Sequence, residues 1–110
     1  MKTVVVLNHD QMGHGDPALG QKILATFLRK CRTLKGLSAI VFYNGGVKLL
    51  VKGSPVLAEL HQLHEAGVDL RPCGTCVDFY DLRQQIDLVP PSNMDEIIRE
   101  LDGAHKVVTL

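Results

Sequence analysis

Two cysteines with two residues between them, in the segment PCGTC at positions 72–76, are the residues of this sequence best suited to do chemistry. Cysteines at this spacing can form a redox disulfide, supply half of a metal site, present a sulfur nucleophile or fill a turn. A metal site would need about four ligands, and the chain has one such pair without a second. We therefore expect no metal and no cofactor, and we favour a reactive sulfur site over a purely structural turn.

The second cysteine of the pair is the better candidate nucleophile. Thr75 and Asp78 have the spacing of a capping box, which predicts a helix that places Cys76 in its first turn. The amides and the dipole at that end of a helix favour a thiolate, the nucleophilic form of cysteine. The like charge of Asp78 opposes this effect, so the sequence leaves the net pKa shift open. Cys73 lies just upstream and can approach Cys76 if the turn is tight.

The remaining cysteine has a different context. Cys31 falls on the apolar stripe of a predicted helix, so we expect a small buried hydrophobic residue there. Three cysteines is an odd count, and the apolar start of the chain is too short for a signal peptide, which argues against a framework of structural disulfides. These features predict a cytoplasmic protein with reduced thiols.

The elements that must position the cysteines alternate between strands and helices. Short β-branched apolar runs predict the strands, and capping residues or prolines followed by apolar residues at helical spacing predict the helices. This alternation predicts an α/β fold with a mostly parallel sheet and helices on both faces. The expected strands are 3–7, 39–43, 68–70, 86–89 and 106–110, and the expected helix starts are Asp16-Pro17, Ser54-Pro55, Thr75 and Asn93.

In such sheets, binding sites collect beyond the carboxyl ends of the strands. The predicted loops at that edge are 8–16, 44–48 and 73–78. Asn44-Gly45-Gly46 most often indicates a tight turn, but unhindered glycine amides at the end of a strand could also bind an anion. The candidate binding residues are therefore Asn44, Gly45, Gly46 and Thr75.

Composition excludes several classes of function. The chain has 110 residues, 45% of them hydrophobic, which suits a single domain spanning 1–110. Its formal net charge of zero argues against a nucleic-acid partner, and no apolar run approaches the roughly 20 residues that cross a membrane. The glycine-containing loop 12–20 fails as a nucleotide site, because Gln21 stands where a P-loop needs lysine and Ala18 where a dinucleotide motif has its third glycine.

Five motifs taken together are specific: MGHGD at 12–16, FYNGGVKL at 42–49, SPVL at 54–57, CGTC at 73–76 and SNM at 92–94. In these motifs the chain resembles the DsrE/DsrF-like (YchN-like) sulfur-reduction family, in particular the DsrE-like domain of the sulfurtransferase-like selenium metabolism proteins. The resemblance implies a three-layer α/β/α domain with a five-stranded parallel sheet, assembled into dimers, trimers or hexamers. It also implies a persulfide on the cysteine that matches Cys76, with Cys73 as the additional cysteine of the CGTC subgroup.

The resulting hypothesis is a small cytoplasmic carrier that accepts sulfur, or selenium, on Cys76 and exchanges it with donor and acceptor proteins. Cys73 would release the cargo by forming a disulfide. The alternative is a non-catalytic oligomeric module that binds a small ligand or metal. Many members of the family have glycine where this chain has Asp81, and aspartate takes a left-handed conformation at some cost, so the end of that helix could differ.

Overall fold

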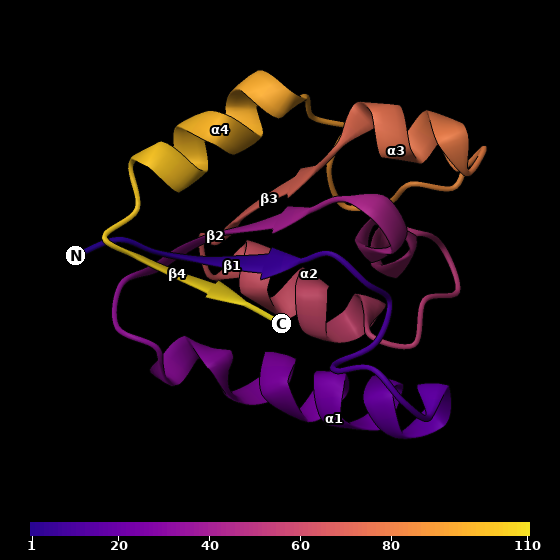
Figure 1. The fold of residues 1–110 in the computed structure, drawn as a ribbon, viewed down its shortest axis with the longest axis horizontal. Coiled ribbons are helices and arrows are strands. Elements are labelled where there is room, and N and C mark those ends of the chain that lie inside the picture. The colour runs from indigo at the N-terminus through magenta and orange to yellow at the C-terminus, as the bar shows by residue number, and fades with distance from the viewer.

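Four parallel strands form the centre of the computed structural model, which describes all residues 1–110, and they lie in the order β3–β2–β1–β4 (Figure 1). The strands are β1 (Thr3–Leu7), β2 (Leu37–Phe42), β3 (Asp69–Pro72) and β4 (Lys106–Thr109). β1 consists of Thr, Val and Leu and is buried along its whole length, as expected for a strand covered on both faces. The predicted α/β fold with a parallel sheet is therefore confirmed.

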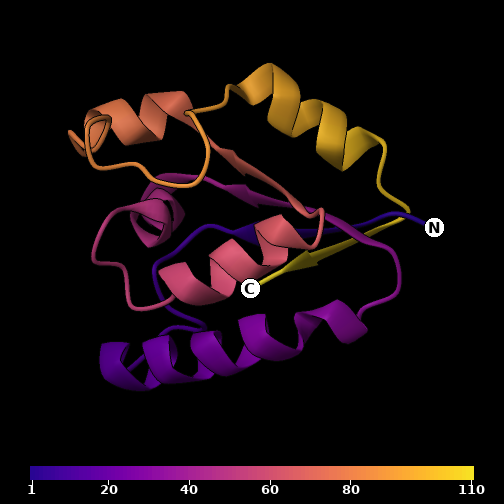
Figure 2. The ribbon, with the colours of Figure 1, turned by 180° about the vertical axis from the view of Figure 1, so that it is seen from behind.

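Helices cover both faces of this sheet (Figures 1 and 2). The helical segments are α1 (Pro17–Lys30), α2 (Leu57–Glu65), α3 (Gly74–Phe79) and α4 (Met94–Asp102), with two 3-10 segments, η1 (Cys31–Thr33) and η2 (Asn44–Leu50). α1 and α2 lie on one face, α4 lies on the other, and α3 lies beyond the carboxyl end of β3. No helix is both long enough and apolar enough to span a bilayer.

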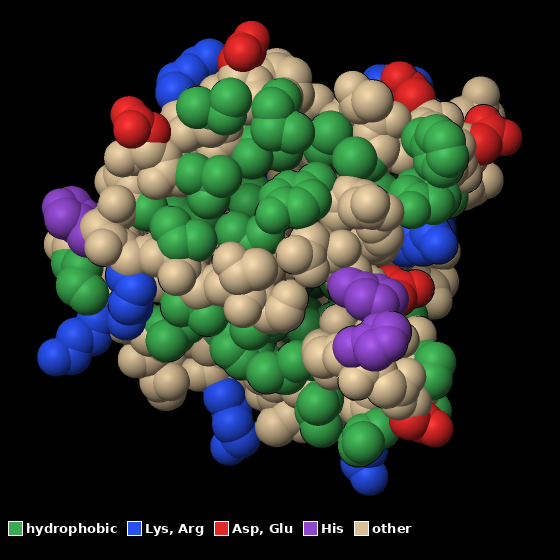
Figure 3. Space-filling model, in the orientation of Figure 1, with side chains coloured by type: hydrophobic (Ala, Val, Ile, Leu, Met, Phe, Trp, Pro, Cys, Tyr) green, Lys and Arg blue, Asp and Glu red, His purple; other side chains and the backbone are tan.

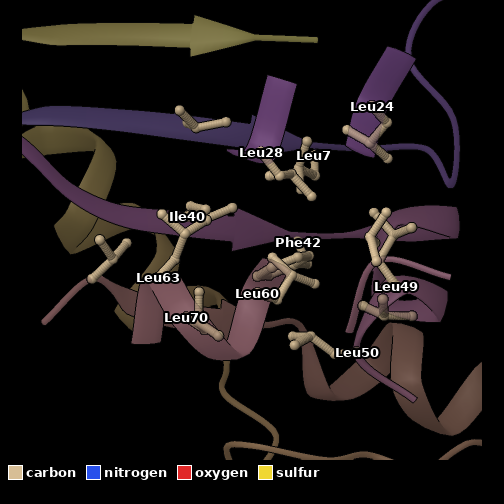
Figure 4. Close-up of a cluster of buried hydrophobic side chains, with 14 of the residues drawn as sticks. Leu7, Leu24, Leu28, Ile40, Phe42, Leu49, Leu50, Leu60, Leu63 and Leu70 are labelled. Atoms are coloured by element: carbon tan, nitrogen blue, oxygen red, sulfur yellow. The ribbon is translucent and has the colours of Figure 1, made fainter. Parts of the chain in front are cut away.

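Alternating side chains of the strands divide the core into two clusters. On β2, Ile40 and Phe42 point toward α1 and α2, where Figure 4 shows them beside leucines of those helices. Ala39 and Val41 point the other way and pack in a smaller cluster with Ile97 of α4. The first cluster contains 16 buried residues and the second 6, so α4 shields less of the sheet than the two helices opposite.

Two predicted helix starts are confirmed by their capping contacts. The Asp16 carboxylate accepts a hydrogen bond from the Leu19 amide at 2.9 Å, and Pro17 occupies the first helical position, where its missing N–H costs nothing. The Asn93 side chain accepts in the same way from the Glu96 amide at 2.9 Å. The predicted start at Ser54-Pro55 is wrong by a short distance, because α2 begins at Leu57.

The predicted fifth strand at 86–89 is wrong, and the sheet has four strands. Ile86 forms an isolated antiparallel bridge with Val51, away from the parallel sheet. Leu88 has a φ of 69°, in the left-handed region, which breaks an extended run, and two prolines follow it. The apolar residues of this segment instead pack on the core as part of an irregular connection between α3 and α4.

An ion-pair network attaches α4 to the sheet. Glu100 of α4 is almost buried and lies 2.7 Å from the Lys2 ammonium and 3.2 Å from the Arg71 guanidinium. Burial tends to raise the pKa of the Glu100 carboxyl, but its hydrogen bonds to Lys2 and Arg71 prevail, and the pKa is lowered. The Glu100 carboxylate is therefore charged at neutral pH and holds α4 against the amino end of β1 and against β3.

Candidate functional site

The carboxyl ends of β2 and β3 bring two predicted loops together. Cys73 follows β3 directly, and its amide donates a hydrogen bond to the Phe42 carbonyl of β2 at 2.9 Å. Asn44 begins η2 just after β2 ends. Because β2 and β3 are neighbours in the sheet, η2 and α3 face each other across this edge.

A pocket of about 270 Å³ lies between these two segments. It is lined by Asn44, Thr75, Cys76, Phe79 and Tyr80. The predicted binding residues Asn44 and Thr75 are thus part of its wall, whereas Gly45 and Gly46 lie in η2 beside it. Phe79 and Tyr80 are not among the residues that the sequence motifs single out, although their spacing of three and four residues from Cys76 places all three on one side of a helix.

The Cys76 sulfur accepts a hydrogen bond from the backbone amide of Asn44, with 3.1 Å between nitrogen and sulfur. Cys76 is partly exposed and lies in the first turn of α3, as predicted. Partial burial raises the pKa of its thiol, the Asn44 amide lowers it, and the neighbouring Cys73 thiol raises it again. The net shift is upward, so the thiol form of Cys76 predominates at neutral pH.

The predicted capping box at Thr75 and Asp78 is wrong. α3 begins at Gly74 with Cys73 in the N-cap position and has no side-chain capping bond. Asp78 instead forms two hydrogen bonds with the Arg83 guanidinium, at 2.7 and 3.0 Å, and these lower the pKa of its carboxyl. The charge of Asp78 is therefore paired with Arg83 and does not act on Cys76 as an isolated negative charge.

The glycine between the two cysteines is required by a close approach of two backbones. The Gly74 amide donates to the Ser92 carbonyl at 3.0 Å, and a Cβ built on Gly74 would lie 2.7 Å from that same oxygen. Asp81, at the position where many relatives have glycine, takes a left-handed conformation with a φ of 55°. The turn at the end of α3 is thus kept with aspartate in place of glycine.

Asn44 is held by one hydrogen bond at its backbone amide, to Cys76, and by another at its side chain. Its φ of 49° is left-handed, a conformation that asparagine tolerates better than most residues. Its side-chain oxygen accepts a hydrogen bond from the Tyr80 hydroxyl at 2.7 Å. The Lys48 ammonium lies 4.4 Å from the centroid of the Tyr80 ring, within the range of a cation–π contact.

The three cysteines differ sharply in accessibility, and all are free thiols. Cys31 and Cys73 are each 3% exposed, whereas Cys76 lines an open pocket. Burial raises the pKa of the Cys31 thiol, and its sulfur contacts the Leu28 carbonyl at 3.4 Å. The expectation that Cys31 is a buried hydrophobic residue is confirmed.

We predict that limiting iodoacetamide modifies Cys76 first and Cys31 last. The reagent must reach the sulfur, and only Cys76 is open to solvent to an appreciable extent. Peptide mapping after partial alkylation measures the order. Preferential labelling of Cys31 would contradict the assignment, and denatured protein, in which all three thiols react, is the control.

No three or more His, Cys, Asp and Glu side chains are grouped so that they could hold a metal ion. What the structure provides is a partly exposed sulfur, a second thiol beside it and one amide N–H directed at the sulfur. This set of groups suits thiol and persulfide chemistry, in which a sulfur anion forms at Cys76 and is stabilised by a hydrogen-bond donor.

The fold and the site together define the class of this protein: an α/β domain with a parallel sheet and a pair of free thiols directly after one of its strands. The sequence model of the DsrE/DsrF-like family matches residues 1–110, so the chain belongs to that family, whose members generally take part in sulfur relay with partner proteins. The family resemblance found in the sequence motifs is therefore confirmed.

Solved structures agree on the fold. The ychN protein from E. coli superposes with a TM-score of 0.72 at 22% sequence identity, covering 99% of this chain and 98% of that one. MTH1491 from Methanobacterium thermoautotrophicum, described as a protein of unknown function, superposes with a TM-score of 0.71 at 16% identity, covering 99% and 98%. At these identities the similarity establishes the fold alone. Comparison with curated proteins gives no match.

Proposed function

We propose that this protein carries sulfur as a persulfide on Cys76 and passes it between donor and acceptor proteins. The observation that carries the proposal is the hydrogen bond from the Asn44 amide to a pocket-exposed Cys76 sulfur, because it stabilises negative charge on an atom that a partner can reach. Membership of a sulfur-relay family supports the choice of sulfur as cargo. A cytoplasmic location fits free thiols that must stay reduced.

Loading is a thiol–persulfide exchange. The Cys76 thiolate attacks the outer sulfur of a persulfide on the donor, the donor's S–S bond breaks, and the donor leaves as a thiolate that takes up a proton. A thiolate of the acceptor then attacks the same outer sulfur and releases Cys76. Since the pKa of the Cys76 thiol is raised, loading should accelerate as the pH rises toward that pKa. Selenium could take the place of the outer sulfur in the same steps.

Cys73 offers a second way to discharge the cargo. Its thiolate would attack the inner sulfur of the Cys76 persulfide, form the Cys73–Cys76 disulfide and expel hydrosulfide. Two electrons pass to the departing sulfur, so a thiol reductant must then reduce the disulfide before another cycle. The support for this step is the position of the two cysteines, because Cys73 is the N-cap residue of α3 and Cys76 lies three residues later in its first turn. The neighbouring Cys73 thiol also raises the pKa of Cys76.

Intact-mass measurement after incubation with a low-molecular-weight persulfide tests the proposal. The wild-type protein should gain one sulfur atom, a reductant should remove it, and peptide mapping should place it on Cys76. A protein that gains no mass under conditions in which its thiols remain reduced would favour the non-catalytic binding module instead.

We also propose a homo-oligomer that assembles through the α4 side of the sheet. Exposed apolar side chains gather there: Met94 and Ile98 of α4 are 47% and 55% exposed, and Val107 of β4 is 46% exposed. Figure 3 shows hydrophobic side chains between α4 and the sheet in the upper half of the view, and a smaller group lower down toward α1. A second copy is the occupant we favour, because a chain with zero net charge meets no overall repulsion from its own copy.

Replacing Ile98 with aspartate should convert the oligomer into a monomer, since it would bury a charge in an apolar interface. Light scattering at micromolar concentration measures the mass. Leu19→Asp is the matched control, because Leu19 is 57% exposed but belongs to α1 on the opposite side. A monomeric wild type would refute the oligomer, and dissociation caused only by Leu19→Asp would place the interface on the α1 side.

A further inference from the structure

The hydroxyl of Tyr80 is connected to the Cys76 sulfur through a single residue of a different segment. Tyr80 donates to the Asn44 side-chain oxygen at 2.7 Å, and the Asn44 backbone amide donates to the Cys76 sulfur at 3.1 Å. Cys76 lies in α3 and Tyr80, one helical turn later, is the C-cap residue of that helix, where its amide donates to the Cys76 carbonyl at 3.1 Å. α3 therefore holds Asn44 at both its side chain and its backbone.

The position of Asn44 depends on such restraint. Its left-handed backbone, with a φ of 49°, is less stable than the common conformations, so a free loop would leave it part of the time. Such an excursion would turn the amide away from the sulfur. The hydrogen bond from Tyr80 opposes the excursion because it is made only when the Asn44 side chain is in place.

The Tyr80 ring is itself held by two neighbours. The Lys48 ammonium lies 4.4 Å from the centre of the ring, and the Phe79 ring meets it edge to face, with 5.2 Å between centroids and an interplanar angle of 89°. A hydroxyl on an oriented ring loses less conformational freedom when it donates to Asn44 than a hydroxyl on a free side chain would.

We propose that Tyr80 is a positioning residue of the sulfur site: its hydroxyl fixes Asn44 so that the Asn44 amide stays directed at Cys76 and stabilises a thiolate there. The benefit of this hydrogen bond for sulfur transfer rests on the proposed carrier function. When an acceptor takes the outer sulfur, Cys76 departs as a thiolate, and a leaving thiolate that is better stabilised departs faster. The same amide increases the thiolate fraction available for loading.

The pH profile of Cys76 alkylation in Tyr80→Phe tests the positioning role. The substitution keeps the ring and its contact with Lys48 and removes only the hydroxyl. A weakened Asn44–sulfur bond should raise the apparent pKa of Cys76 by about 0.5 and slow alkylation below that pKa about threefold, with the same plateau rate at high pH. Tyr43→Phe is the matched control, because it removes the other tyrosine hydroxyl of the chain. Tyr43 packs, like Cys76, against the smaller core cluster of six buried residues.

Tyr80→Phe leaves the other titratable groups around the sulfur in place, and the control Tyr43→Phe removes only one of them. They are Cys73 after β3, Lys48 in η2, Tyr43 before η2, and the Asp78–Arg83 pair of α3 and the turn after it. A shift seen in Tyr80→Phe and absent in Tyr43→Phe therefore reports the loss of the Tyr80 hydroxyl.

Asn44→Gly provides a second variant. Glycine keeps the left-handed backbone and the amide but lacks the side chain that Tyr80 holds. Asn44→Gly alone should therefore show the same rise in pKa, and adding Tyr80→Phe to it should cause no further change. The proposal is overturned if Tyr80→Phe raises the pKa of Cys76 equally in the wild-type and Asn44→Gly backgrounds. It is also overturned if neither single variant raises that pKa.

These measurements use iodoacetamide and no sulfur donor. A protein that never accepts sulfur would still show the pKa shift, in which case the positioning role stands and the carrier function fails. If sulfur loads on Cys76 but neither Tyr80→Phe nor Asn44→Gly shifts the pKa, the carrier function stands and the positioning role fails.

Discussion

Cys76→Ser is expected to abolish persulfide loading, whereas Cys73→Ser should load normally and hold its sulfur several-fold longer than the wild type. Serine cannot form a persulfide, so the first variant removes the site of attachment. The second variant keeps the attachment site and removes only the internal thiolate that attacks the inner sulfur and expels hydrosulfide. Intact mass followed over time after removal of the donor measures both the extent of loading and its decay.

Cys31→Ser is the matched control for these two variants. Cys31 is as buried as Cys73, at 3% exposure each, but it lies at the end of α1, in η1, and contacts the Leu28 carbonyl rather than the site. It should load and decay like the wild type if it folds. Equal decay in Cys73→Ser and wild type would show that Cys73 is a structural residue and that release depends on an acceptor alone. Loading that survives Cys76→Ser would contradict the carrier proposal.

Gly46→Ala is expected to destabilise the fold strongly, while Gly45→Ala next to it should have little effect. A Cβ on Gly46 would lie 1.9 Å from the Leu7 carbonyl oxygen and 2.7 Å from the Leu7 carbonyl carbon. These are backbone atoms of β1, and the same oxygen accepts a hydrogen bond from the Tyr43 amide at 3.2 Å. Neither side can move without breaking the contact between β1 and the start of η2.

We expect Gly46→Ala to cost about 3 kcal/mol, at the upper end of the range for forced overpacking, and to lower the melting temperature by more than about 10 °C. A Cβ on Gly45 would meet its nearest atoms at 3.8 Å, an ordinary contact distance. Gly45→Ala should therefore change the stability by less than about 1 kcal/mol, and the reduced freedom of the unfolded chain favours it slightly. Thermal unfolding of the two variants compares them directly, and equal melting temperatures would disprove the close approach at Gly46.

Local signals explain why much of the fold could be predicted from the sequence. The β-branched run of β1, the Asp16-Pro17 start of α1 and the Asn93 cap of α4 each depend on residues close in the chain, and the structure has all three. The position of the CxxC pair after a strand follows from the same alternation. A short apolar run carries less information: 86–89 has the composition of a strand, but a left-handed residue and two following prolines make the segment irregular.

The sequence by itself thus determined an α/β protein of the DsrE/DsrF-like family with a thiol pair at the carboxyl edge of its sheet. Only the tertiary structure decided which groups surround the sulfur. The amide that contacts Cys76 belongs to Asn44, 32 residues earlier, and the hydroxyl that holds Asn44 belongs to Tyr80, 36 residues after it. No periodicity or capping rule links positions so far apart. They meet because β2 and β3 are neighbours in the sheet, and the segments that follow these strands must pack against each other.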